Sequence, residues 1–205
     1  MEKKLPDNSE IRYKNIIDES DFVLGVEQLR SIHEKLFTGI FQSAGKFRNT
    51  NVVKREIILN GDTIPYSDCR KILPDMVMAI LSQYNLDYNN MPREEVVKNI
   101  SKFTADIWKV HPFDDGNTRA IYLFIHRYLR SLGYDISLEI FNNNSTYFRN
   151  ALVKAVYENP EFYIKSDISA LENFFKKCLV DNKIELNIDD VYIDGIVKFR
   201  KGINR

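Results

Sequence analysis

The chain has 205 residues, of which 44% are hydrophobic and 28% charged, as expected for a soluble globular protein with one core. Its 29 basic and 29 acidic residues cancel, so the whole chain carries no charge signature of binding to a nucleic acid. No apolar run approaches the ~20 residues that span a bilayer, and the polar N-terminus lacks the apolar centre of a secretory signal. We therefore expect a cytoplasmic protein with no nucleic-acid or membrane partner, although secretion by a route without such a signal stays open.

Two cysteines, Cys69 and Cys178, lie far apart in the sequence and have no metal-ligand spacing. This is typical of free thiols in a reducing compartment.

Helices dominate the predicted elements. Residues 1–20 are polar and are expected to form an N-terminal arm, residues 21–180 one domain, and residues 181–205 a polar C-terminal extension. Within the domain, apolar side chains at three- and four-residue spacing predict helices over residues 22–37, 68–83, 92–111, 117–132, 147–157 and 167–179, with an irregular stretch around residues 142–144. The predicted fold class is all-α.

The period changes between the first two of these helices. Residues 52–66 carry β-branched side chains on both sides of Asn60-Gly61, a strong signal for a β-hairpin. An isolated two-stranded hairpin is only marginally stable in water, so this small flap is expected to lean on the helices. Its edge could pair with a partner, or the hairpin could be purely structural.

One stretch concentrates chemistry between two predicted helices: His111-Pro112-Phe113-Asp114-Asp115-Gly116-Asn117-Thr118-Arg119. The helix that begins near Asn117 would present unpaired N–H groups and a partial positive charge, which suits an anion such as a phosphate. Arg119 adds a fork of donors at the same place. Pro112 and Gly116 would set the turn between the helices.

Other residues of the stretch suit catalysis on a phosphate compound. His111 has an unperturbed pKa near neutrality and is the natural general base for a hydroxyl. Asp115 could hold Mg²⁺, which binds through one or two carboxylates and substrate phosphates. Phe113 is expected to anchor the loop in the core. The alternative is a polar interhelical turn with a capping Asn. His33 and His126, on apolar helix faces, are expected to be structural.

The stretch resembles the active-site motif of the Fic-domain family, written His-Pro-Phe-x-Asp/Glu-Gly-Asn-x-Arg in its shorter form. Residues 29–37 and 44–48 resemble that family's first conserved block, and residues 144–152 resemble the segment after the motif helix. The resemblance covers roughly residues 22–180 and implies a Fic-type helical bundle with a β-hairpin flap.

The resemblance also implies an enzyme that transfers AMP from ATP to a Ser, Thr or Tyr hydroxyl of a target protein. His111 would be the general base and Asp115 would hold Mg²⁺. The implied nucleotide-binding residues are Asp114, Gly116, Asn117, Thr118 and Arg119. In the family the flap pairs with an extended segment of the target, which makes these the docking candidates: Leu59, Asn60, Gly61, Asp62, Thr63, Ile64 and Tyr66.

Thr118 departs from the family pattern, in which adenylylating members commonly have Gly and the phosphorylating Doc branch has Lys. Two alternatives therefore stay open, a Doc-like phosphotransferase and a catalytically silent binding module. Many Fic proteins also carry an inhibitory Ser/Thr-x-x-x-Glu-Gly/Asn helix, and no Ser or Thr of this chain is followed by Glu at the fourth position. Restraint could come from an antitoxin-like partner, from a degenerate element around Ser31, or be absent; self-association and self-modification also stay open.

Overall fold

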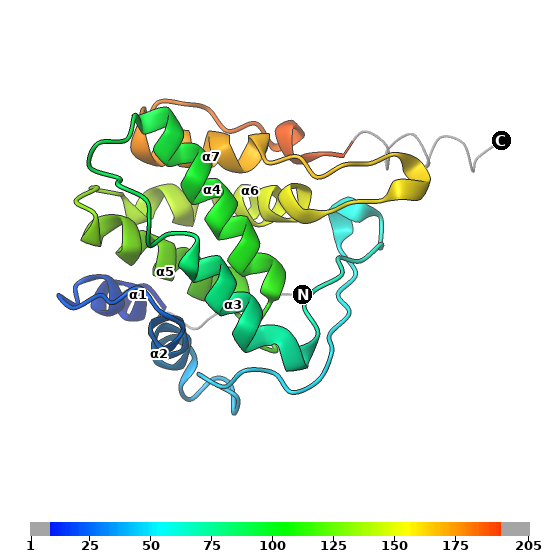
Figure 1. The fold of residues 1–205 in the computed structure, drawn as a ribbon, viewed down its shortest axis with the longest axis horizontal. Coiled ribbons are helices and arrows are strands. Elements are labelled where there is room, and N and C mark those ends of the chain that lie inside the picture. Colours follow the sequence, from blue (N-terminus) through cyan, green and yellow to red (C-terminus); the bar gives the residue numbers. More distant parts are fainter. Residues whose placement is uncertain (1–8, 194–205) are drawn as a thin grey trace.

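The chain forms a helical bundle in a computed structural model that describes residues 9–193 (Figure 1). The α-helices of this part are α1 (Ser9–Ile17), α2 (Val26–Phe37), α3 (Ile72–Leu81), α4 (Arg93–Val110), α5 (Asn117–Ser131), α6 (Leu138–Val156) and α7 (Ser169–Leu179). Short 3₁₀ turns, Ile57–Leu59, Cys69–Lys71, Pro160–Phe162 and Ile188–Val191, lie in the connections. The all-α fold class is confirmed.

Helices α4 and α5 form the centre of the bundle. α4 packs against α3, α5, α6 and α7, while α5 packs against α1, α2 and α4. Every residue of α5 from Ala120 to Leu129 is buried, so this helix is surrounded by protein on all sides. The loop between α4 and α5, which carries the motif, is therefore held by two helices at the centre of the bundle.

The ends of α4 follow from its sequence. Pro92 precedes the helix, Glu94 and Glu95 lie in its first turn, and Lys109 lies in its last turn, which is the favourable order for the helix dipole. The helix stops because His111 adopts a left-handed conformation, with φ 51° and ψ 60°. This conformation is uncommon for a residue other than Gly, Asn or Asp, and it turns the chain toward α5.

Three expectations need correction. Helix α6 runs through residues 142–144, and only Asn144 departs from helical geometry, since its side chain bonds back to the Ile140 carbonyl. The expected helix 68–83 is a 3₁₀ turn followed by α3. The hairpin around Asn60-Gly61 reduces to a single antiparallel bridge between Arg55 and Thr63 that encloses the 3₁₀ turn Ile57–Leu59. We keep the name flap for residues 52–66.

Segments on both sides of the predicted domain also pack on the bundle. Tyr13 and Ile16 of α1 are buried, as are Val191 and Ile193 beyond α7. The first part of the predicted arm and the last part of the predicted extension, residues 1–8 and 194–205, lie outside the described residues. The boundaries at residues 20 and 180 stay predictions.

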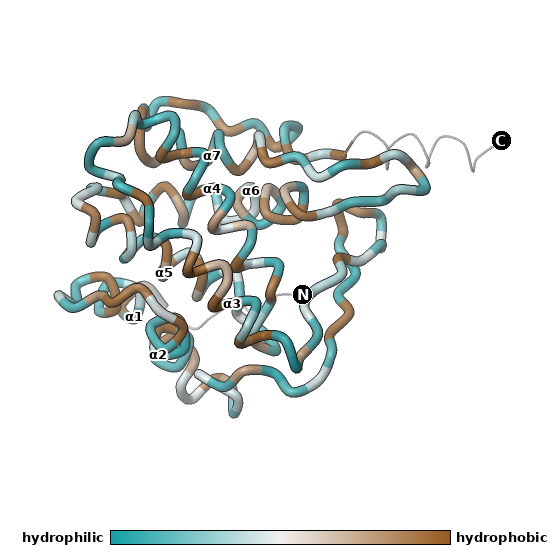
Figure 2. The backbone as a smooth tube through the Cα atoms, viewed as in Figure 1, coloured by the Kyte–Doolittle hydropathy of each residue, from teal (hydrophilic) through white to brown (hydrophobic). Residues whose placement is uncertain are grey.

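Along the helices, hydrophobic residues alternate with hydrophilic ones (Figure 2). Within residues 9–193, none of the helices combines the length and the apolar character needed to span a membrane.

Candidate active site

The motif loop is built around Phe113, which is fully buried and stacks on the ring of His33 at 3.7 Å between centroids. The Gly45 N–H donates to Nδ1 of His33 at 2.9 Å, so Nε2 carries the proton and donates to the Asp115 carbonyl at 3.0 Å. Burial lowers the pKa of His33 to about 4, which keeps the ring neutral. The expected structural role of His33 and the expected anchoring role of Phe113 are both confirmed.

Asn117 closes the loop from the other end. Its side-chain oxygen accepts from the Phe113 N–H at 2.9 Å, and its side-chain nitrogen donates to the Phe113 carbonyl at 2.8 Å. The Asn117 amide is thus bonded to the backbone of the loop, and Gly116 rather than Asn117 occupies the cap position of α5.

Gly116 makes the turn into α5 at φ 75°. A Cβ atom at this position would lie 2.4 Å from the ring of Phe37, so any side chain would displace the core. Only glycine combines this backbone angle with this close approach. The turn leaves the first N–H groups of α5, at Asn117, Thr118 and Arg119, without helical acceptors. The sequence predicts that this helix start binds an anion, and that role stays a prediction.

His111 is buried beside this turn, with 3% of its surface exposed. Neither ring nitrogen has a hydrogen-bond partner. Its ring stacks on Tyr66 at 4.0 Å and meets the edge of Trp108 at 5.7 Å. Burial holds the pKa of His111 well below 6.5, and the positive charges of Lys54, Arg48 and Arg149 add to that shift. The imidazole is therefore neutral, and a lone pair is available to accept a proton.

Arg48 fixes the backbone of His111. Its guanidinium is buried and donates from Nε to the His111 carbonyl at 2.7 Å, and it also donates to the carbonyls of Thr50, Ser67 and Val110. One side chain thereby ties the end of α4 to both ends of the flap. This role of Arg48 was missed by the sequence reading, in which the residue was only part of a conserved block.

Thr118 and Arg119 make different contacts with the core. The Thr118 hydroxyl accepts a hydrogen bond from the indole N–H of Trp108 at 3.0 Å. The guanidinium of Arg119 lies 4.8 Å from the centroid of the Phe37 ring, in a cation–π contact. Asp114 and Asp115 are exposed at the mouth of the loop, and one oxygen of Asp115 accepts from the Gly116 N–H at 2.7 Å.

A cavity of about 770 Å³ opens at the first turn of α5. Its wall combines Thr118 and Arg119 with the flap residues 55–58, with α6 residues around its kink, and with Tyr13 of α1. Residues 144–152, which resemble the family segment after the motif helix, contribute Ser145, Thr146 and Arg149 to this wall. Tyr13 and Glu56 gave no sequence signal, because their contribution depends on how α1 and the flap pack.

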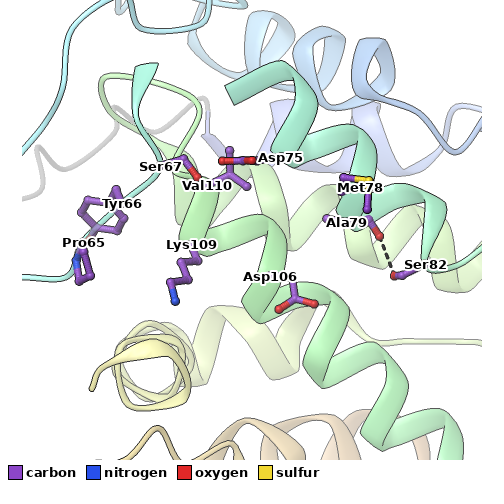
Figure 3. A pocket seen from close by; sticks show the side chains of 10 residues that line it. All are labelled: Pro65, Tyr66, Ser67, Asp75, Met78, Ala79, Ser82, Asp106, Lys109 and Val110. Carbon is purple, nitrogen blue, oxygen red and sulfur yellow. Dashed lines mark hydrogen bonds between the residues drawn. The ribbon is translucent and has the colours of Figure 1, made fainter. Parts of the chain in front are cut away.

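A second cavity, of about 370 Å³, lies on another side of the flap (Figure 3). Pro65, Tyr66 and Ser67 form one wall, and residues of α3 and α4, including Met78 and Lys109, form the others. Neither of these two cavities is lined by His111 itself. Tyr66 lines the second cavity and stacks on His111, so its ring lies between that cavity and the imidazole.

The flap residues divide into two groups. Leu59 and Ile64 are buried and attach the flap to the bundle, whereas Asn60, Gly61 and Asp62 are exposed at its tip. The Asp62 carboxylate accepts from the Tyr157 hydroxyl at 2.6 Å, which braces the tip against the chain after α6. Thr63 and Tyr66 are half-buried. Ile57, just outside the predicted docking set, is 94% exposed.

Comparison with known proteins agrees with this geometry. The family model described as Fic/DOC matches residues 23–129, just over half of the chain and all of the motif. The chain belongs to the Fic/DOC family.

Individual relatives have low sequence identity to this chain. The protein adenylyltransferase VbhT of Bartonella schoenbuchensis is 24% identical over 180 residues, covering 87% of this chain and 32% of that protein. The chain thus spans about a third of the length of this curated Fic relative.

Solved Fic domains share the fold. The N-terminal Fic domain of an effector protein from Bartonella sp. AR 15-3 superposes with a TM-score of 0.66 at 17% identity, covering 89% of this chain and 83% of that one. The BepC protein of Bartonella tribocorum, crystallised with bound AMPPNP, gives a TM-score of 0.61 at 18% identity over 83% and 82% of the two chains.

Proposed function

We propose that the chain transfers AMP from ATP to a Ser, Thr or Tyr hydroxyl of a target protein, with His111 as the general base. The observation that carries this proposal is the neutral imidazole of His111, unbonded at both nitrogens, close in the chain to the start of α5, whose first N–H groups lack helical acceptors. A base must accept a proton at the working pH, and a depressed pKa keeps this ring deprotonated at neutrality. The relative VbhT is named a protein adenylyltransferase, and the BepC structure holds an ATP analogue, which supports the nucleotide substrate.

In the proposed reaction, His111 takes the proton of the acceptor hydroxyl while the hydroxyl oxygen attacks the α-phosphorus of ATP. The bond from the α-phosphorus to the bridging oxygen breaks, and pyrophosphate leaves with the electron pair. Negative charge on the phosphate oxygens would be stabilised by the N–H groups that begin α5 and by Arg119. The roles of Asp114, Gly116, Asn117 and Thr118 in nucleotide binding stay predictions. For Asn117 we propose the backbone N–H as the donor, because its side chain is bonded within the loop. The Gly116 N–H donates to Asp115 in the structure and would have to leave that carboxylate to contact a phosphate.

Magnesium fits this site through Asp115. Mg²⁺ takes one or two carboxylates together with phosphate oxygens, and Asp115 is an exposed carboxylate at the helix start. Within the described residues no group of three or more His, Cys, Asp or Glu could hold a metal alone, so the substrate phosphates would complete the site. The ion would neutralise phosphate charge.

Thr118 favours AMP transfer over phosphorylation. Its hydroxyl is bonded to Trp108, and it brings no positive charge to the phosphates, unlike the Lys of the Doc branch. We propose that the exposed flap tip at Asn60, Gly61 and Asp62 receives the target. Leu59 and Ile64 would contact the target only through their backbone groups, because their side chains are buried. An antitoxin-like partner stays a prediction.

The test uses ATP labelled at the α- or the γ-phosphate, with Mg²⁺ and a bacterial lysate as the source of acceptors, and compares the chain with its His111→Ala variant. We expect label on protein from the α-position alone and none with the variant. Label from the γ-position alone would establish a phosphotransferase instead. No His111-dependent label would contradict transfer under these conditions, provided that circular dichroism shows both proteins folded.

A further inference from the structure

Arg149 brings a guanidinium to the wall of the cavity that Arg55 and Arg119 also line. It comes from α6, after the kink at Asn144, and its side chain is 30% exposed. A guanidinium presents a planar fork of donors that matches a phosphate or a carboxylate in two-point contact. Neither the motif nor the predicted site includes this residue.

Glu56 occupies that fork in the structure. The Glu56 carboxylate is 2% exposed and contacts Arg149 at two points, with distances of 2.7 and 3.1 Å. A buried carboxylate needs such a partner, because removing the partner leaves an uncompensated charge in a medium of low dielectric constant. The pair therefore fixes the beginning of the flap to α6.

The same carboxylate also holds the residue that covers His111. The Tyr66 hydroxyl donates to Glu56 at 3.2 Å, and the Tyr66 ring stacks on His111. Arg149, Glu56, Tyr66 and His111 thus form a continuous series of contacts from the cavity to the proposed base. The predicted role of the flap, docking of a target segment, does not explain why its first half carries the buried carboxylate of Glu56.

We propose, on the basis of the nucleotide transfer proposed above, that Arg149 is a second phosphate-binding residue and that substrate phosphates compete with Glu56 for it. When phosphates take the guanidinium, Glu56 loses its partner, moves toward water and releases Tyr66. Nucleotide binding and exposure of His111 are then coupled, so the base becomes accessible to the acceptor when the donor is in place.

The charges favour this exchange. A triphosphate carries more negative charge than one carboxylate, and the helix start of α5 and Arg119 already attract it to the same cavity. Glu56 regains hydration on leaving its buried position, which offsets part of the lost ion pair. Coupling of this kind is reciprocal, so any change that weakens the hold of Glu56 must strengthen phosphate binding.

Binding can be measured without any transfer, using calorimetry on the full chain with AMPPNP and Mg²⁺, and with inorganic tripolyphosphate as a probe without the nucleoside. Glu56→Gln keeps a hydrogen-bond partner for Arg149 but removes the charge. We expect it to tighten binding of both probes about tenfold, since a charge-assisted contact is no longer broken on binding. Asp167→Asn, which removes the charge of an ion pair with Lys154 of α6 outside this cavity, is the matched control and should bind as the parent does.

A second variant removes the guanidinium without stranding a charge. Glu56→Gln combined with Arg149→Gln should bind both probes at least about tenfold more weakly than Glu56→Gln alone, because the phosphate contact is lost. Equal affinity of these two variants, or of the parent and Glu56→Gln, would overturn the proposal.

Movement of the flap has its own reporter, because Trp108 is the single tryptophan and lies 5.8 Å from the Tyr66 ring. AMPPNP at a saturating concentration should change Trp108 fluorescence in the parent. The change should be much smaller in the double variant, measured at the higher concentration that saturates that variant. An unchanged parent spectrum at saturation would overturn the release of Tyr66. Transfer could fail while these binding results hold, so failure of the proposed function and failure of the proposed phosphate competition are distinguishable.

Discussion

The ring of Tyr66 stacks on the imidazole of His111, with 4.0 Å between the centroids and 27° between the planes. This contact buries the only histidine whose two ring nitrogens both lack partners among the described residues. In this conformation an acceptor hydroxyl has no open approach to the imidazole. Catalysis by His111 therefore requires Tyr66 to move.

Tyr66→Ala should expose His111 to chemical modification. The stacked ring contributes ~1 kcal/mol beyond its buried area, so its removal should speed carbethoxylation of His111 by about tenfold or more. Peptide mass mapping after diethyl pyrocarbonate treatment would follow each histidine separately. Tyr66→Phe keeps the ring and is the matched control, which should react more slowly than the alanine variant. Equal rates at His111 in the parent and Tyr66→Ala would mean that the ring does not protect it.

Gly116→Ala should destabilise the protein more than the same change at another glycine with positive φ. Gly116 and Gly133 have φ of 75° and 85°, but a Cβ at Gly116 meets Phe37 at 2.4 Å, whereas a Cβ at Gly133 meets nothing within 4 Å. The backbone term costs ~1–2 kcal/mol at both positions, and overpacking adds ~1–3 kcal/mol at Gly116 alone. Urea unfolding of the two variants measures this difference, and similar losses would show that Phe37 relaxes freely.

Asn117→Ala should loosen the motif loop. The variant leaves the N–H and the carbonyl of Phe113 unpaired in a buried place, which costs ~1–3 kcal/mol for each group. We expect reduced stability in urea together with weaker AMPPNP binding, because the helix start is no longer held in place. Asn89→Ala, in the exposed turn before α4 and without a positive φ, controls for loss of an amide and should change both quantities much less. Unchanged nucleotide binding in a destabilised Asn117→Ala would separate the loop from the phosphate site.

Much of this arrangement follows from local sequence. The spacing of apolar residues predicts α2, α4, α5 and α7 to within a few residues, since each of these helices buries a face or its whole circumference. Pro112 and Gly116 mark the turn between α4 and α5, and Phe113 is the apolar anchor that such a loop needs. These features depend on residues close together in the chain.

The misplaced features depend on contacts between distant segments. The flap has no regular strands, because the Glu56 side chain turns inward to Arg149, 93 positions later. The flap backbone after Glu56 closes a 3₁₀ turn instead of pairing as a strand. The interval at residues 142–144 stayed helical because Asn144 absorbs the kink within one residue. Asn117 was expected to bind the nucleotide, but its side chain closes a pair of hydrogen bonds with the Phe113 backbone that the motif alone does not reveal.

Stability should fall as the pH is lowered from about 6.5 toward 4. Burial lowers the folded-state pKa of His33 and of His126 to about 4, and it also holds the pKa of His111 well below the unfolded value near 6.5. The unfolded state therefore binds protons first, so stability is full above pH 6.5 and is lost as the pH falls to the folded pKa. Each histidine contributes at most ~3 kcal/mol to this loss.

Urea unfolding at pH 7.5, 6.0 and 5.0 would measure the slope. The carboxyl groups with lowered pKa, such as Asp62 and Asp167, lose their contribution only at lower pH and do not account for a change in this window. A stability that stays flat between pH 7.5 and 5.0 would contradict neutral burial of these rings. Replacing His126 by Gln should reduce the slope by about half of the part that His33 and His126 contribute together, while the part from His111 remains.

Thr118→Val should reveal what the unusual residue of the motif does. Valine has nearly the same shape but cannot accept the hydrogen bond from Trp108, whose indole is fully buried. An unpaired buried N–H costs ~1–3 kcal/mol, and Trp108 also meets the edges of His111 and Tyr66. We expect a loss of that size in urea unfolding and a changed Trp108 emission spectrum. Thr118→Ser keeps the hydroxyl and should restore both. If valine and serine behave alike, the hydroxyl does not hold Trp108, and Thr118 would be free to face the phosphates.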